Sequence, residues 1–155
     1  MEITLVAIGE KKKITIRLVE GEDFKKLTKK RFSFSWKSLK SKAELYKLQI
    51  AGEDDILGVM ALTDFPAEKR IEIKLLACAT ENIGKKKVYG GIAGCLIAFA
   101  CRQAKVKYGL LACVSLVPKT ELKLHYIEKY KMLDAGWQLY LEGNPLNDII
   151  LKYLL

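Results

Sequence analysis

Apolar and polar positions alternate through the first twenty residues, with one interruption. Ile3 to Ile8 and Ile14 to Val19 are rich in β-branched residues, and Gly9-Glu10-Lys11 lies between them. A period of two indicates strands with one buried face, and a glycine-containing break between two such runs is typical of a hairpin. The sequence therefore predicts an N-terminal β-hairpin.

Three further strands are predicted before residue 80. Glu44 to Ile50 and Ile56 to Leu62 are separated by turn residues at 52–55, and Asp64-Phe65-Pro66 interrupts the chain before a longer run from Arg70 to Ala79. Such breaks of glycine, proline and acidic residues separate elements. Simple alternation in the last run places one set of side chains on one face, Ile71, Ile73 and Leu75, and another set on the opposite face, Glu72, Lys74 and Leu76.

Helical spacing dominates the second half of the chain. Val88 to Lys105 carries apolar side chains around its whole circumference, which predicts a helix buried on most sides. A short apolar strand is predicted at 108–114, and an amphipathic helix from about Thr120 to Lys131. Residues 22–42 are rich in lysine and are predicted to form a helix followed by an extended stretch.

Strands in succession, followed by strand, helix, strand, helix and strand, predict an α/β protein with a mixed sheet. The chain has 155 residues, of which half are hydrophobic. That length suits one domain, which buries about two-thirds of its unfolded surface. No internal repeat or low-complexity linker divides the sequence, so we expect a single domain over residues 1–155.

The chain is strongly basic, with a formal net charge of +9. Lysines cluster at 11–13, 25–42 and 85–87. Such a balance favours anionic partners, whether phosphate-bearing ligands, nucleic acid or a membrane surface. For the first two clusters a solvated surface is the simpler interpretation.

The sequence gives little support for a metal site or a membrane location. The four cysteines form no CxxC pair and there is a single histidine, a donor set too poor for zinc. Met1 is not followed by the basic and apolar regions of a signal peptide. The longest apolar run, Ile92 to Cys101, is far short of the ~20 residues that span a bilayer. We expect no metal, and a reduced, soluble, cytoplasmic protein.

The strand from Arg70 leads into a glycine-rich turn at the start of the apolar helix. Gly90, Gly91 and Gly94 carry no Cβ that would keep an anion from the backbone, and the free N–H groups of a first helical turn attract negative charge. Lys85, Lys86 and Lys87 stand immediately upstream, as the printed sequence shows. This combination predicts a phosphate-bearing cofactor.

Two common phosphate motifs do not fit this turn. A Walker A loop requires a Ser or Thr after GK, but Gly84-Lys85 is followed by Lys86, and Ala79 stands where the first glycine belongs. The dinucleotide fingerprint GxGxxG is also missing, and no acidic residue ends a second strand about twenty residues on.

The run from Gly90 to Ile97, GGIAGCLI, resembles the turn and apolar helix with which GNAT-superfamily acetyltransferases hold the pyrophosphate of acetyl-CoA. Downstream, HYIEKYKM at 125–132 is similar to the helix box of that family. Residues 137–142 and 149–155 are similar to its closing strands. The resemblance covers about residues 43–155, most closely small bacterial GNAT proteins. Lys131 replaces the usual glycine of the box, and Val88 falls where the turn usually has a basic residue.

The resemblance implies a GNAT acyl-CoA N-acyltransferase fold, in which a mixed, mostly antiparallel sheet is flanked by helices. It also implies transfer of an acetyl group from acetyl-CoA to an amine. The pantetheine arm would enter a gap between the strands at 70–79 and 108–114. The residues implied in cofactor binding are Leu76, Ala77, Cys78, Lys86, Lys87, Val88, Tyr89, Gly90, Gly91, Ile92, Ala93 and Gly94.

Two catalytic residues are implied by the same resemblance. Tyr126 matches the box tyrosine that serves as general acid, with Tyr130 as the alternative if the register is shifted by one turn. Tyr126 and Tyr130 share a helix face and could equally be core residues. Glu72 is the candidate base, acting through a water, although an ion pair with Lys74 is the simpler interpretation. His125 is expected at the surface.

A different class of function also remains open. The chain could be a catalytically inactive GNAT-fold protein that binds CoA or nucleic acid. Base stacking needs exposed aromatic rings among basic residues, which only Phe32, Phe34 and Trp36 provide. Their exposure therefore distinguishes the two functions. The sequence identifies neither the amine acceptor nor the oligomeric state.

Overall fold

A computed structural model describes residues 1–154. Its centre is a nine-stranded sheet with the order β6-β1-β2-β3-β4-β5-β7-β9-β8. Every neighbouring pair is antiparallel except β5 and β7, which run parallel. The strands are β1 (Glu2–Leu5), β2 (Glu10–Leu18), β3 (Glu44–Ile50), β4 (Ile56–Phe65), β5 (Arg70–Cys78), β6 (Tyr89–Gly90), β7 (Cys113–Leu116), β8 (Leu133–Asp134) and β9 (Leu139–Glu142).

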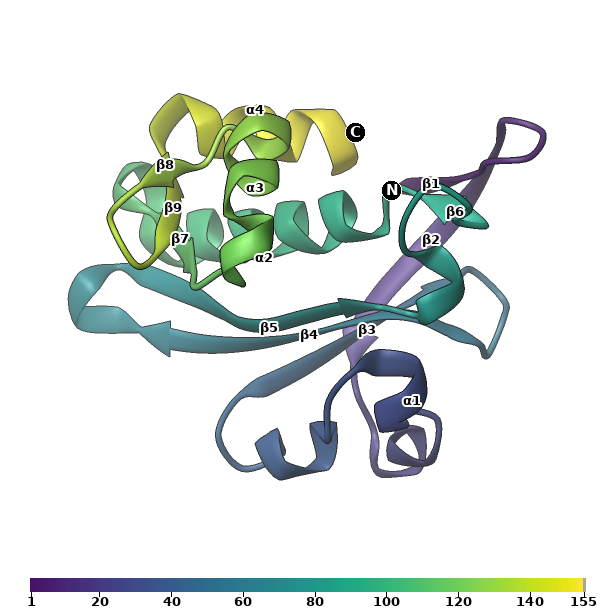
Figure 1. Cartoon of the computed structure of the whole chain (residues 1–155). Helices are drawn as coiled ribbons and strands as arrows, with labels where there is room; N and C mark the ends of the chain where they lie inside the picture. The colour runs from purple at the N-terminus through teal and green to yellow at the C-terminus, as the bar shows by residue number, and fades with distance from the viewer. Residues whose placement is uncertain (155) are drawn as a thin grey trace.

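Helices cover both faces of this sheet (Figure 1). The longer ones, α2 (Ile92–Tyr108), α3 (Lys123–Tyr130) and α4 (Gly143–Leu154), lie on one face. The short α1 (Lys29–Phe32) lies on the other. Single 3-10 turns complete the chain: η1 (Gly21–Lys25), η2 (Trp36–Leu39), η3 (Pro66–Glu68), η4 (Thr80–Asn82), η5 (Gly109–Leu111) and η6 (Thr120–Leu122). Within residues 1–154 no helix combines the length and apolarity that a membrane crossing requires.

The predicted α/β class with a mixed, mostly antiparallel sheet is confirmed. The N-terminal hairpin is present, with Leu5 opposite Glu10, although its turn lies at residues 6–9. The strands predicted at 44–50 and 56–62 are also present, the second extended to Phe65. These elements are set by local patterns of apolar residues, which is why the sequence is sufficient to place them.

Four predicted elements differ from the structure. The helix predicted from Val88 begins only at Ile92, because Tyr89–Gly90 form β6. Residues 143–154 form the helix α4, not a closing strand, and Leu155 lies outside the described residues. Leu146, Ile149 and Leu154 are buried at helical spacing, and Pro145 occupies the first turn, where a missing N–H costs nothing. The central helix continues to Tyr108, so the next strand begins only at Cys113. Residues 36–39 form a 3-10 turn where an extended stretch was expected.

Two apolar clusters hold the helical layers to the sheet. The larger packs α2 and α4 against β4, β5, β7 and β9, and α2 is buried on most sides, as predicted. The smaller cluster packs Phe32 and Trp36 against the opposite face of β3 and β4. The two layers therefore stand on opposite sides of the same central strands.

A bulge in β5 changes which side chains face each layer. Ala61 pairs with Leu75 and Leu62 with Ile73, so Lys74 is the extra residue. The predicted alternation is consequently wrong beyond Ile73. Leu75 packs with the α1 layer, whereas Leu76 packs with the α2 layer.

Candidate functional site

The parallel strands β5 and β7 separate after a short paired segment. Their pairing runs from Arg70 opposite Cys113 to Ile73 opposite Leu116. Val117 and Pro118 then lead the chain away, and proline has no N–H with which to extend the ladder. The last five residues of β5, 74–78, therefore have no strand partner on that side.

A cavity of about 750 Å³ occupies this split. Phe34, which follows α1, lines it from one side of the sheet, and Tyr126 of α3 lines it from the other. Figure 1 shows these two helices on opposite faces of the sheet. The cavity thus reaches both layers, so two ligands could approach it from opposite directions.

Most residues predicted to bind a cofactor line this cavity. From β5, the turn and the start of α2 these are Leu76, Ala77, Cys78, Lys87, Tyr89, Gly91, Ile92 and Ala93. The other four, Lys86, Val88, Gly90 and Gly94, do not line it. The structure therefore brings β5 and the turn together, although residues 79–86 separate Cys78 from Lys87 in the chain.

The four remaining positions have identifiable surroundings. Lys86 is exposed beside the turn. The carbonyl of Val88 accepts a hydrogen bond from Val6 N–H at 2.9 Å, and Gly90 is opposite Thr4 in the ladder of β6 with β1. These contacts anchor the turn to the edge of the sheet.

Gly94 lies where α2 crosses α4. A Cβ at this position would be 2.2 Å from Cε1 of Tyr153, much closer than any real contact. The absence of a side chain at Gly94 therefore permits close packing of two helices, which is the role that the structure supports for it.

Gly94→Ala is accordingly expected to destabilise the fold by about 1–3 kcal/mol, the usual cost of overpacking. Chemical denaturation measures the change. The double variant Gly94→Ala/Tyr153→Ala should lose less than the sum of the two single changes, because the clash is absent. Additive losses would contradict the packing role.

The turn before α2 is closed by its own hydrogen bonds. Gly91, the N-cap of α2, has φ +94°, a conformation that glycine adopts readily. The side-chain carbonyl of Asn82 accepts a hydrogen bond from Tyr89 N–H at 2.9 Å, so Asn82 closes the turn. Asn82 is 5% exposed and lines the cavity, and its Nδ2 has no partner among the described residues.

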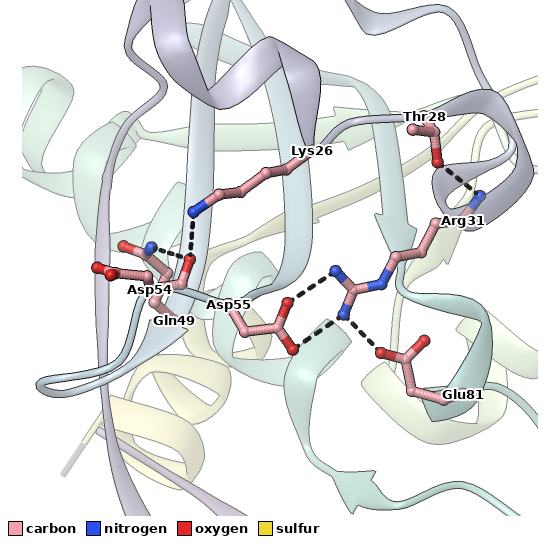
Figure 2. Close-up of polar contacts among 7 residues, drawn as sticks. All are labelled: Lys26, Thr28, Arg31, Gln49, Asp54, Asp55 and Glu81. Carbon is pink, nitrogen blue, oxygen red and sulfur yellow. Dashed lines mark hydrogen bonds and ion pairs between the residues drawn. The ribbon is translucent and has the colours of Figure 1, made fainter.

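An arginine fixes the start of this turn to the layer on the other face (Figure 2). Arg31 of α1 donates to both carboxylate oxygens of Asp55, at 2.8 and 3.2 Å, and to Glu81 at 2.5 Å. Glu81 belongs to η4, and its carbonyl accepts the N–H of Val88 at 3.0 Å. The guanidinium therefore connects α1, the turn between β3 and β4, and the turn before α2.

The charged side chains that line the cavity are all basic, among a largely apolar lining. Five lysines line it, namely Lys74, Lys85, Lys87, Lys119 and Lys129, and within residues 1–154 no Asp or Glu does. Burial lowers the pKa of Lys129, and the neighbouring ammonium groups of Lys87 and Lys152 lower it further. Ammonium groups that face one another without a carboxylate between them favour an anionic ligand.

Aromatic residues of α3 close the cavity. The rings of Tyr126 and Tyr130 lie 5.9 Å apart, and Tyr130 is buried against Tyr153 at 6.2 Å. Burial raises the pKa of Tyr126, and its proximity to Cys78 adds to the rise. Burial also raises the pKa of the Cys78 thiol to about 11. At neutral pH both groups therefore keep their protons.

His125 is exposed, as expected, yet it also lines the cavity.

Glu72 lies outside the cavity lining. Its carboxylate pairs with Arg70 at 3.4 Å, not with Lys74 as the simpler interpretation expected. Arg70 also donates to Ser115 Oγ at 2.8 Å, across the paired segment of β5 and β7. The structure thus places Glu72 beside the closed end of the split.

No protein-family model matches the chain, and no curated protein matches its sequence. Solved structures do match it. A structure of mutant forms of spermidine/spermine N-acetyltransferase SpeG from Vibrio cholerae aligns over 92% of this chain and 96% of that chain, with 17% identity and a TM-score of 0.62. Nourseothricin acetyltransferase aligns over 82% and 95%, with 12% identity and a TM-score of 0.56. An N-acetyltransferase from Staphylococcus aureus Mu50 aligns over 83% and 98%, with 17% identity and a TM-score of 0.56.

The chain has the GNAT fold. The split between β5 and β7 lies between the strands where the sequence resemblance predicted a gap, now residues 70–78 and 113–116. Lys131, which replaces the usual glycine of the helix box, has φ +58° and ends α3 in the left-handed conformation that glycine favours. The lysine therefore leaves the backbone of the GNAT box intact.

The aromatic row that could stack on nucleic acid is mostly absent from the surface. Phe32 and Trp36 are 0% and 1% exposed, whereas Phe34 is 41% exposed and lines the cavity of the GNAT fold. A single exposed ring is not a stacking platform for successive bases. This arrangement disfavours the nucleic-acid alternative.

Sequence reasoning missed three lysines of the cavity. Lys74 was interpreted only as an ion-pair partner of Glu72, but it lines the cavity. Lys119 follows β7 directly after Pro118, and Lys129 stands three residues after Tyr126, on the same side of α3. Lys129 could have been found from its spacing to Tyr126. Lys119 could not, because its place depends on where the chain turns after β7, and that turn has no local sequence signature.

Proposed function

We propose that this protein is an acetyl-CoA-dependent N-acetyltransferase that acts on an amine. The observation that carries the proposal is the basic cavity in the split between β5 and β7, which reaches both faces of the sheet. Such a cavity can admit a phosphate-bearing cofactor from one side and an acceptor from the other. The GNAT fold supports this reading without identifying the substrates.

The residues present fit acetyl-CoA. The first-turn N–H groups of α2, behind Gly91, would hold the pyrophosphate, with Lys85 and Lys87 beside them and Lys86 adding to the positive field. The unpartnered Nδ2 of Asn82 is a donor at the same turn. The remaining implied residues, Val88, Tyr89, Gly90, Ile92, Ala93 and Gly94, would shape the turn and the start of α2.

The free edge of β5 would hold the pantetheine arm. Leu76, Ala77 and Cys78 have no strand partner on the side of β7, so their backbone groups can bond an amide-bearing chain as a neighbouring strand would. Acetyl-CoA supplies a thioester whose carbonyl carbon accepts a nucleophile. With the pantetheine arm along the free edge of β5, the thioester carbon would lie toward the closed end of the split, near the bulge at Lys74.

The chain's own residues would position the amine and move two protons. The neutral amine nitrogen forms a bond to the carbonyl carbon while the carbon–sulfur bond breaks, and the electron pair leaves on sulfur. Tyr126 donates its proton to that sulfur, giving CoA thiol and an amide. Glu72 receives the amine proton through a water, since its carboxylate lies outside the cavity lining. Solvent then restores the proton of Tyr126.

Calorimetric titration with acetyl-CoA tests the cofactor site. We expect saturable 1:1 binding, together with a higher melting temperature, because the ligand binds only the folded state. Gly91→Val should abolish both effects, since a β-branched residue cannot readily adopt φ +94°.

Gly91→Asn is the matched control, because asparagine tolerates the left-handed region far better than valine does. It should retain most of the affinity. Equal binding by all three proteins would show that the turn at Gly91 does not hold the cofactor. If acetyl-CoA binds but a broad panel of amines yields no acetylated product, the alternative of a catalytically inactive CoA-binding protein is correct.

A further inference from the structure

The five lysines of the cavity fall into two regions. Lys129 of α3 belongs with the turn before α2, since, besides burial, the ammonium group of its neighbour Lys87 lowers its pKa. Lys85 and Lys87 belong to the turn before α2, next to Gly91. Lys74 is the bulged residue of β5, directly after the last residue paired with β7, and Lys119 lies three residues beyond Leu116. Lys74 lies four positions before Cys78, a rise of about 13 Å along an extended strand, whereas Lys87 is a neighbour of Cys78 itself.

Only one of these regions meets the charges of the cofactor. The proposed function places the phosphates of acetyl-CoA at the turn before α2, whereas its thioester is uncharged. Lys74 and Lys119 at the closed end of the split would therefore face no cofactor phosphate. They also form no ion pair among the described residues.

The nearest carboxylates in the chain do not compensate these two lysines. Glu72, two residues from Lys74, pairs with Arg70, and neither Glu72 nor Glu121 lines the cavity. Two solvated ammonium groups beside the reacting carbon repel a second cation and attract an anion. A polyamine acceptor would find no carboxylate in the lining to bind its charges.

We infer that the acceptor is a small amine that also carries an anionic group, a carboxylate or a phosphate, and that Lys74 and Lys119 bind that group. This inference rests on the proposed function. It separates this protein from an enzyme that acetylates polyamines, and it makes the two lysines determinants of acceptor specificity.

Paired acceptors that differ only in the anion test the inference. Glucosamine and glucosamine 6-phosphate form the phosphate pair, tyramine and tyrosine form the carboxylate pair, and spermidine is the cationic probe. Two measurements are made: kcat/KM for acetyl transfer, and calorimetric binding of each acceptor to the protein saturated with CoA. In at least one pair the anionic member should bind and react about tenfold better, as expected for one charge-assisted contact.

Lys74→Gln and Lys119→Gln should each remove most of that preference while changing the affinity for acetyl-CoA by less than twofold. Lys87→Gln should instead weaken acetyl-CoA binding and affect both members of a pair equally. Lys42→Gln, an exposed lysine outside the cavity, is the matched control and should change nothing. The pair that shows the preference identifies the anion.

Three results would overturn the inference. Equal or better use of spermidine or of the neutral amines would contradict it while leaving the N-acetyltransferase proposal intact. Acetyl-CoA binding with no acceptor of any kind bound or acetylated would also contradict it. Absence of acetyl-CoA binding would contradict the proposed function, and the inference would fail with it.

Discussion

Replacing Tyr126 with phenylalanine is expected to lower the turnover rate by roughly 10²–10⁴, the usual loss when a general acid is removed. The melting temperature and the affinity for acetyl-CoA should stay nearly unchanged. The ring of Tyr126 lines the cavity, and its hydroxyl makes no hydrogen bond to a protein atom within residues 1–154. The substitution therefore removes a proton donor without removing a structural contact.

The pKa of Tyr126 is consistent with this role. Burial raises it above the ordinary value of a phenol, and Cys78 adds to the rise. The hydroxyl thus stays protonated through the neutral and mildly alkaline range, where it can donate to a departing thiolate. The loss caused by Tyr126→Phe should accordingly be the same at pH 7 and pH 9.

Tyr130→Phe is the matched comparison. Tyr130 shares the face of α3 but is 2% exposed and packs on Tyr153. Its variant should turn over normally. A loss in Tyr130→Phe with normal turnover in Tyr126→Phe would assign the acid to Tyr130. Normal turnover in both variants would mean that neither phenol protonates the leaving group.

Lys47→Met should destabilise the protein by about 3 kcal/mol, a typical cost of leaving one partner of a buried pair alone. Lys47 Nζ and Asp23 Oδ2 lie 2.7 Å apart, and the two side chains are 9% and 11% exposed. The variant retains the carboxylate of Asp23 without its cation. The loss is at the lower end of the range because the pair borders a polar hollow, which also contains Arg17, Glu20 and Gln49.

The destabilisation should depend on pH. Burial is the largest single effect and raises the pKa of Asp23, but the hydrogen bonds from Lys47 and from the Glu20 N–H, with the positive charges of Lys47 and Lys26, together outweigh it. The pKa in the folded protein is therefore lowered. The pair of Lys47 with Asp23 stabilises the fold at pH values above the pKa of Asp23 in the unfolded chain, about 4. This contribution is lost as the pH falls through the lower pKa of Asp23 in the folded protein. In Lys47→Met the cation that partly offset the burial of the Asp23 carboxylate is gone. Protonation of Asp23 at low pH then removes the buried charge, and with it part of the destabilisation. The difference between the two proteins should therefore shrink from pH 7 to pH 4.

Urea denaturation at both pH values measures this difference. The double variant Asp23→Asn/Lys47→Met should recover part of the lost stability at pH 7, since no charge remains buried. Lys12→Met removes a partner from the exposed pair with Glu10 and should have little effect. An equal loss at pH 7 and pH 4 would contradict the electrostatic explanation.

The parts of the fold that the sequence predicted are those with a local signal. Alternation over 44–50 and the apolar circumference of α2 are visible in short windows, and both elements are present. The C-terminal helix was missed because residues 149–155 were interpreted from their similarity to the closing strands of the GNAT family and not from their own period. Its helical period becomes clear only when Leu146 is included.

The remaining differences depend on residues far apart in the chain. The bulge at Lys74 arises from pairing with Ala61 and Leu62, which no pattern within β5 records. Gly94 is explained by Tyr153, 59 positions later by the printed numbering. For the candidate site, the glycine turn could be predicted from its own residues. Most of the basic lining could not, because Lys74 depends on the bulge in β5 and Lys119 on where the chain turns after β7; only Lys129 has a local signal, its spacing from Tyr126.

The contact between Arg31, Asp55 and Glu81 constrains any redesign of this protein (Figure 2). In the proposed function the acceptor enters from the side of the α1 layer and the turn that ends at Gly91 holds the cofactor, yet one guanidinium contacts both segments. Any redesign that rebuilds residues 22–42 would therefore have to keep Arg31. A designer who grafted a foreign segment there without it would lose an anchor of the turn before α2.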